Sequence, residues 1–160
     1  MERRETVATF DRDRLTTLFP TLGWDSPTVV RCTEETSGEG TYVKTNPRRP
    51  RYGHVSLVCS PAFVLSVRLQ HHWPDDAPAR IRPALDEALL AGMMDGLTAE
   101  EYPAWLCTVR TVTVRYVPEQ TTPQAVKRAA ALAVQDALRR RTWKLQTWPP
   151  GAVPHGDEPA

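Results

Sequence analysis

The chain has 160 residues, which is the size of one ordinary globular domain that can bury a core without cross-links. Its 20 Lys and Arg residues nearly balance its 19 Asp and Glu residues, so the net charge of +1 excludes neither an acidic nor a basic partner. The three cysteines lie in apolar runs and lack metal-ligand spacing, which favours reduced core thiols in a cytoplasmic protein. Residues 1–10 contain no apolar leader segment, and no later run is as long as a membrane span, so neither secretion nor membrane insertion is expected.

The N-terminal third predicts one short helix and a hairpin. Residues 1–9 are polar and are expected to be loose, whereas Asp11 to Phe19 can form one or two helical turns before a proline. The first strand candidate is 28–33. The glycines of 37–40 predict a turn, after which 41–45 would return as the second strand of the hairpin.

Two alternating runs follow. Residues 54–59 alternate apolar and polar side chains, and a second run places Phe63, Leu65, Val67 and Leu69 on one face. Consecutive runs of this kind, separated by a short turn, are typical of antiparallel strands.

The next segment changes to a helical period. Apolar residues recur at helical spacing over 81–89, with Asp76 placed to cap the helix N-terminus and Pro78 within its first turn. Gly92 or Gly96 is expected to end the helix.

A long strand and a second helix complete the pattern. In the strand 105–117 the apolar alternation slips by one residue, which predicts a bulge near 110–111 or a strand covered on both faces. The second helix should begin at Thr122 as N-cap with Pro123 as its first residue, and end in the arginines 139–141.

The C-terminal residues contain one more short strand candidate at 144–148. Residues 149–160 are too rich in proline and too poor in apolar side chains to pack, so this tail is expected to be disordered. The order of elements predicts an α+β fold, with two helices on one face of a mostly antiparallel sheet.

Charge is unevenly distributed along this order. Residues 70–104 contain seven acids against two arginines, whereas 105–148 contain eight basic residues against two acids. A further basic group lies in 44–51, where Pro47 and Pro50 restrict the backbone around three arginines. Basic groups that a sheet can bring together would suit a phosphate backbone, and the alternative is that they are solvated surface charges.

Three segments carry a resemblance to a known family. They are RYGHVSLVCSP at 51–61, LDEALLAG at 85–92 and TTPQAVKRAAALAVQDALRRR at 121–141. In this order they resemble the fourth domain of translation elongation factor G, which the tetracycline-resistance ribosomal-protection proteins share. The resemblance covers about 26–148, and leaves 1–25 as an N-terminal extension.

The resemblance implies a fold like domain 2 of ribosomal protein S5, with a left-handed βαβ crossover. It also implies a non-catalytic module that binds the ribosome or structured RNA through two tip loops, which map to 45–51 and 116–122. No cofactor or metal is implied. The residues expected to contact RNA, on these loops and beside them, are Arg48, Arg49, Arg51, Tyr52, Arg115, Tyr116, Pro118 and Thr122.

The sequence also departs from the family. The glycine-rich first tip is replaced by Pro47, Arg48, Arg49 and Pro50, and the histidine of the second tip falls at Val117 or is absent. No G-x-x-x-x-G-K-[ST] segment occurs, so GTP hydrolysis is not expected. The glycine-rich phosphate loop of the small-molecule kinases that share this fold is also absent, and the chain is therefore not expected to be an enzyme.

The sequence is open to a second functional interpretation, and it argues against a metal site. A protein-interaction or regulatory module that kept the fold and lost its RNA contacts would also fit the altered tips, and it could form a homodimer through the sheet. The pairs His71-His72 and Asp75-Asp76 do not form a convincing metal site, because neighbouring side chains of an extended chain face opposite ways and the spacing fits no established ligand set.

Overall fold

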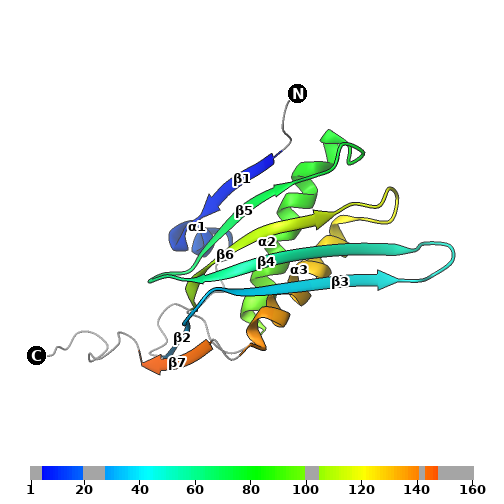
Figure 1. Cartoon of the computed structure of the whole chain (residues 1–160). Helices are drawn as coiled ribbons and strands as arrows, with labels where there is room; N and C mark the ends of the chain where they lie inside the picture. The colour runs from blue at the N-terminus through cyan, green and yellow to red at the C-terminus, as the bar shows by residue number, and fades with distance from the viewer. Residues whose placement is uncertain (1–4, 20–27, 100–104, 141–142, 148–160) are drawn as a thin grey trace, which may run out of the picture.

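A computed structural model describes residues 5–19, 28–99, 105–140 and 143–147. Within this part of the chain, seven strands and three α-helices form one mixed sheet with helices on one side (Figure 1). The predicted α+β class is therefore confirmed. In chain order the elements are β1 (Glu5–Phe10), α1 (Arg12–Leu18), β2 (Thr28–Cys32), β3 (Thr36–Lys44), β4 (Arg51–Pro61), β5 (Ser66–His72), α2 (Arg82–Thr98), β6 (Trp105–Arg115), α3 (Pro123–Leu138) and β7 (Trp143–Thr147).

The main part of the sheet has the strand order β3, β4, β6, β5, β1. The pairs β3–β4, β4–β6 and β1–β5 are antiparallel, and β5–β6 is parallel. Strand β2 joins the start of β6 in parallel and pairs antiparallel with β7. The expected hairpin between residues 28–33 and 41–45 is therefore wrong, because β2 pairs with strands that come later in the chain and not with β3.

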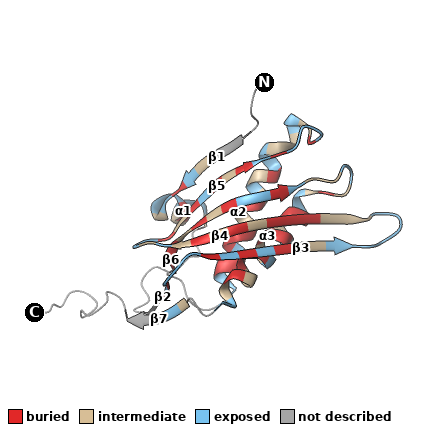
Figure 2. Ribbon diagram, in the orientation of Figure 1, coloured by how far each residue is buried: buried red, intermediate tan, exposed pale blue. Residues whose placement is uncertain are grey.

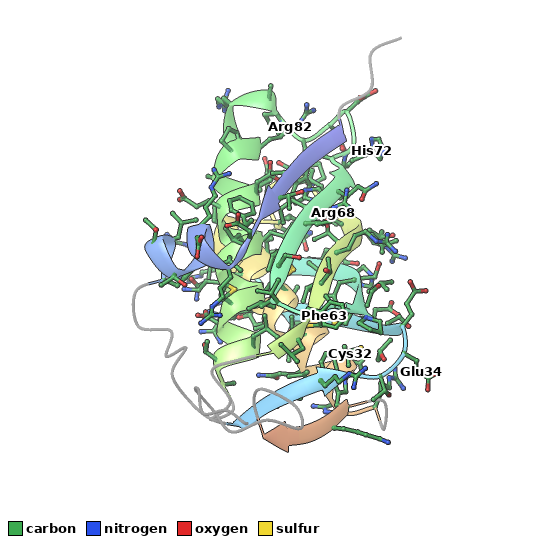
Figure 3. The ribbon with its side chains drawn as sticks, turned by 90° about the vertical axis from the view of Figure 1, so that its left-hand side faces the viewer. Cys32, Glu34, Phe63, Arg68, His72 and Arg82 are labelled. Atoms are coloured by element: carbon green, nitrogen blue, oxygen red, sulfur yellow. The ribbon has the colours of Figure 1, made fainter. Side chains whose placement is uncertain are left out.

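Both long helices lie on the same face of the sheet, and Figures 1 and 3 show the opposite face free of any helix. In Figure 1 the strands β5 and β6 point to the right, β6 lies below β5, and α2 runs behind them. A chain that leaves β5, passes behind the sheet and returns at β6 in this way makes a left-handed crossover. Most parallel connections have the opposite hand.

The segment 37–40 is not a turn, as its glycines had suggested, but the start of strand β3. Residues 33–35 form only a bend, because β2 and β3 both run in the direction of β6 and the chain keeps its course between them. A Cβ atom built at Gly40 would overlap the carbonyl oxygen of Ala129 and the backbone nitrogen of Ala133. The glycines are there because α3 lies directly on the backbone of β3, and no side chain fits between them.

The limits of α2 also differ from the expectation. Asp76 does not cap it, since a short 3-10 turn at 79–81 precedes the helix and Pro78 is still extended. Neither Gly92 nor Gly96 ends it. Both lie inside the helix on the side facing α3, where a Cβ at Gly96 would come within 2.7 Å of the Cβ of Val134. These glycines allow two helices to approach each other closely.

Other expectations are confirmed in part. Asp11 caps α1 by accepting a hydrogen bond from the backbone N–H of Arg14 at 2.9 Å, and Thr122 caps α3 as predicted. The predicted bulge in β6 occurs at Val112, between the residues that pair with Ser56 and Leu57. The expectation of loose residues at 1–9 is wrong for 5–9, which form β1 and pair with β5.

The core lies between the sheet and the helices, as the buried faces in Figure 2 show. All three cysteines are buried and free, which confirms them as core thiols. A hydrogen bond with Cys59, followed by burial, raises the pKa of the Cys107 thiol, so it is a poor nucleophile at neutral pH. Phe63, which the alternation placed inside, is 88% exposed in the turn between β4 and β5.

Some expectations fall on residues that the structure does not describe. They concern the tail 149–160, the end of the first helix at Pro20 and the last residue of the arginine run at 139–141. Within the described ranges, none of the helices is both long and apolar enough to cross a membrane.

Candidate nucleic-acid interface

The first tip loop is a turn that is held by hydrogen bonds to Asn46. The backbone N–H of Arg49 donates to the carbonyl oxygen of Asn46 at 3.1 Å, and the N–H of Arg48 donates to the Asn46 side-chain oxygen at 2.9 Å. Pro47 occupies the second position of this turn, where its fixed φ is favourable. The two arginines are therefore held exposed on an ordered turn at the end of the β3–β4 hairpin.

The second tip loop is closed around Val117. Its carbonyl oxygen accepts hydrogen bonds from the backbone N–H groups of Gln120 and Thr121, both at 3.0 Å, and its own N–H donates to the Thr121 hydroxyl at 2.9 Å. Glu119 reverses the chain with a φ of 67°, a left-handed conformation that is uncommon for residues other than glycine. The loop is thus compact and locally strained.

A hydrogen bond joins the two loops. The backbone N–H of Tyr52, at the start of β4, donates to the carbonyl oxygen of Gln120 at 3.0 Å. Two residues further along β4, His54 lies opposite Arg115 at the end of β6. Segments that are about 70 residues apart in the sequence therefore meet at one end of the sheet, which is the right-hand end in Figure 1.

The predicted contact residues do not all face solvent. The side chains of Arg48, Arg49, Arg115 and Pro118 are exposed. Arg51 is half-buried and donates a hydrogen bond from Nη1 to the carbonyl oxygen of Pro50 at 3.0 Å.

Two of the predicted contacts have structural roles in the fold. The ring of Tyr116 is partly buried and packs against the hydrophobic core. The hydroxyl of Thr122 accepts the backbone N–H of Ala125 at 3.2 Å, and this interaction caps α3.

His54 lies beside the tips and is only 5% exposed. Its Nε2 is 3.3 Å from a carboxylate oxygen of Glu39, and its Nδ1 is 2.8 Å from the hydroxyl of Thr41. Since a carboxylate can only accept, Nε2 carries the proton and Nδ1 accepts from the threonine. Burial, and then the positive charge of Arg115, lower the pKa of His54, so this histidine is neutral at pH 7.

A second histidine is part of a buried network. The Nε2 of His71 donates to Asp86 at 2.8 Å, its Nδ1 lies 3.0 Å from the Thr111 hydroxyl, and the Trp73 indole N–H also donates to Asp86 at 2.7 Å. His71 is fully buried, whereas His72 is exposed on the other face. The two histidines therefore cannot share a metal ion, and the described residues include no group of three or more His, Cys, Asp or Glu suited to one.

Sequence reasoning missed one basic residue near this interface. Arg68 was assigned to neither of the basic groups, because it is an isolated arginine in an apolar alternation. In the sheet it is the direct neighbour of Arg110. The alternation signalled that its side chain faces away from the core, but it did not identify the strand beside it.

No family model matches the chain, and no curated protein matches it either. Among solved structures, a crystal structure of a protein from Thermus thermophilus matches with a TM-score of 0.57 and 20% sequence identity. The match covers 74% of this chain and 18% of that one, so the chain spans less than a fifth of the length of the protein that it matches. At this identity the likeness is one of fold.

Proposed function

We propose that this chain is a non-catalytic RNA-binding module of the cytoplasm that binds the ribosome through its tip loops, as the fourth domain of elongation factor G does. The observation that carries the proposal is the junction of the two loops by the hydrogen bond from Tyr52 to Gln120. This junction places the exposed turn with Arg48 and Arg49 at the same end of the sheet as the second loop.

The physical chemistry of the first tip suits phosphate. Neither Arg48 nor Arg49 forms an ion pair with an acid in the described part of the chain, so both guanidinium groups are free to bind. A guanidinium binds phosphate oxygens through paired hydrogen bonds. Because the turn is already ordered by Asn46, little conformational entropy is lost on binding.

The architecture supports the same proposal. A sheet with two parallel strands joined by a left-handed crossover through α2 is the arrangement that the resemblance implies. We therefore include the ribosomal protein S5 domain 2-like fold, and a role in translation, in the proposal.

Binding to purified small ribosomal subunits, measured by co-sedimentation at several salt concentrations, tests the proposal. We expect the wild-type chain to bind the subunits more tightly than an unrelated structured RNA. The double variant R48Q/R49Q should bind the subunits more weakly and reduce the slope of log affinity against log salt by roughly 1 for each lost phosphate contact.

The matched control is R80Q/R139Q, which removes two exposed arginines that lie outside both tip loops. An equal loss of affinity in both double variants would show that only net charge matters. Absence of subunit binding by the wild-type chain near physiological salt would contradict the proposal.

A protein-interaction module is the second candidate, because Phe63 is 88% exposed in the turn between β4 and β5. Figure 1 shows this turn at the end of the sheet opposite to the tips. An aromatic side chain in a solvent-exposed turn is a common anchor in protein interfaces. If this candidate is correct, the wild-type chain should self-associate in sedimentation velocity or bind a protein partner without binding RNA. F63S should then abolish that association.

A further inference from the structure

The face of the sheet that carries no helix has a basic character that charge counting along the sequence does not reveal. Strands β4, β5 and β6 contain no Asp or Glu, and by alternation three of their four arginines, Arg68, Arg110 and Arg115, lie on this face. Val67 and Leu69 of β5 are buried against the helices, and the alternation turns Arg68 to the other side. Figure 3 shows Arg68 and His72 on the side of the sheet away from α2.

Arg68 and Arg110 form a like-charge pair. They are direct partners in the parallel register of β5 and β6. Like charges at directly opposite positions destabilise a sheet. The side chain of neither residue has an ion pair or hydrogen bond to a residue in the described part of the chain, unlike Arg140, which binds Asp136. Their repulsion is therefore uncompensated, and a bound anion would relieve it.

The surroundings of this pair consist of hydrogen-bonding groups without charge. Ser66 and Thr108 each lie two residues before one of the arginines, and therefore on the same face of the sheet. Their hydroxyls are 3.0 Å apart. Gln70 follows on β5. Hydroxyl and amide groups beside arginines are the usual partners of phosphate and sugar oxygens in nucleic-acid complexes.

The basic face is continuous with the tips. Arg110 and Arg115 lie on the same strand, separated by about 16 Å of extended chain. Arg115 is opposite His54, two residues from the junction of the tip loops. Glu39 on β3 lies beside this path, and its carboxylate is 3.3 Å from Nε2 of the neutral His54, so this acid is a local exception to the basic character of the face.

From these observations we propose that the open face of the sheet around Arg68 and Arg110 is a second RNA-binding surface, which holds the phosphate backbone of RNA independently of its sequence. The inference rests on the proposed function in that the same RNA molecule reaches this face from the tips. The open-face positions of β5 and of β6 up to Arg115 present no Phe, Tyr or Trp side chain on which a base could stack. Sequence is therefore not read here, and the contribution is electrostatic.

The experiment measures binding of the full chain to fluorescent single-stranded RNA oligonucleotides of two unrelated sequences, and to small ribosomal subunits, across a salt series. We expect R68Q/R110Q to weaken binding to both oligonucleotides by the same factor, about tenfold at low salt. Two lost contacts to single-stranded RNA should reduce the salt slope by about 1.4. R68K/R110K, which keeps both charges, should retain the salt slope of the wild-type chain.

The control R80Q/R139Q removes the same charge from other surfaces. If R68Q/R110Q binds both oligonucleotides as tightly as this control does, the inference is wrong, even if R48Q/R49Q still weakens subunit binding and thereby supports the proposed function. If the wild-type chain binds oligonucleotides through Arg68 and Arg110 but does not bind subunits, the ribosome proposal fails and the RNA-binding face stands. Since the two glutamines remove a repulsion at the surface, the thermal midpoint of R68Q/R110Q should not fall, which verifies that the variant is folded.

Discussion

The two faces of the sheet are built from alternate residues of the same strands, yet they are subject to opposite constraints. On the covered face, Gly38, Gly40 and Gly53 have no room for a single methyl group beneath α3. On the open face, Arg68 and Arg110 lie side by side with no acid on either strand. The comparison shows that the covered face is defined by shape, where volume is decisive, and the open face by charge, where volume matters little.

Filling the space at Gly40 should have the largest effect. G40V would push its side chain into the backbone of α3 at Ala129 and Ala133, which cannot move aside as a flexible side chain can. We expect a loss of about 3 kcal/mol or more in the free energy of unfolding, measured by urea denaturation. S37V adds bulk to the same strand on its exposed side and should leave stability within about 0.5 kcal/mol of the wild type. Equal effects of the two changes would contradict the distinction between the faces.

Removing the Asp86 carboxylate should have the second largest effect. D86A would leave the buried N–H groups of His71 and Trp73 without this acceptor. We expect a loss of about 2 kcal/mol in the free energy of unfolding, because buried unsatisfied donors are costly and Asp86 itself is partly exposed. E87A changes the next residue on the exposed side of the same helix and should have little effect. A D86A protein as stable as E87A would show that water replaces the carboxylate.

Protonation of His54 should have the smallest effect on the free energy of unfolding. This residue is an exception to the comparison of the two faces, because it lies on the open face and is nevertheless buried. Its pKa is lowered in the folded protein, so the unfolded chain takes up a proton first as the pH falls. Stability should be complete above the unfolded value of about 6.5 and should decrease below it, until the pH reaches the lowered native pKa. The slope cannot exceed about 1.4 kcal/mol per pH unit for one proton.

Urea denaturation at pH 7.5 and pH 5.5 measures this slope. H54Q should make stability less dependent on pH, whereas H72Q, at an exposed position on the same face, should leave the dependence as in the wild type. Identical pH dependence in the wild type and in H54Q would show that the histidine is not held neutral.

Local patterns predicted the elements whose cause is local. Thr122 and Pro123 correctly marked the start of α3, and the slip in the apolar alternation of β6 correctly indicated a bulge, which occurs at Val112. The predictions were wrong where one residue type can serve two structural purposes, as glycine does. A glycine can allow a turn or a close contact, and for Gly40, Gly92 and Gly96 the contact was the cause.

The residues of the candidate interface were also predicted only in part. The arginines of the first tip were identified from the basic loop between two prolines, and the structure shows the turn that holds them. Tyr116 was expected to contact RNA, and the structure shows its ring partly buried against the core, which the sequence did not indicate because a ring near the end of a strand can face either side. Arg68 was missed because its neighbour Arg110 is distant in the sequence.

The sequence by itself determined the α+β class, the alternation that buries one side of each strand, and the basic turn at 46–49. These depend on backbone preferences and side-chain periods that act over a few residues. Only the tertiary structure decided which strands are neighbours, how closely α3 approaches the sheet, and that two tip loops and a pair of arginines belong to one surface. These depend on contacts between residues tens of positions apart, which local patterns do not encode.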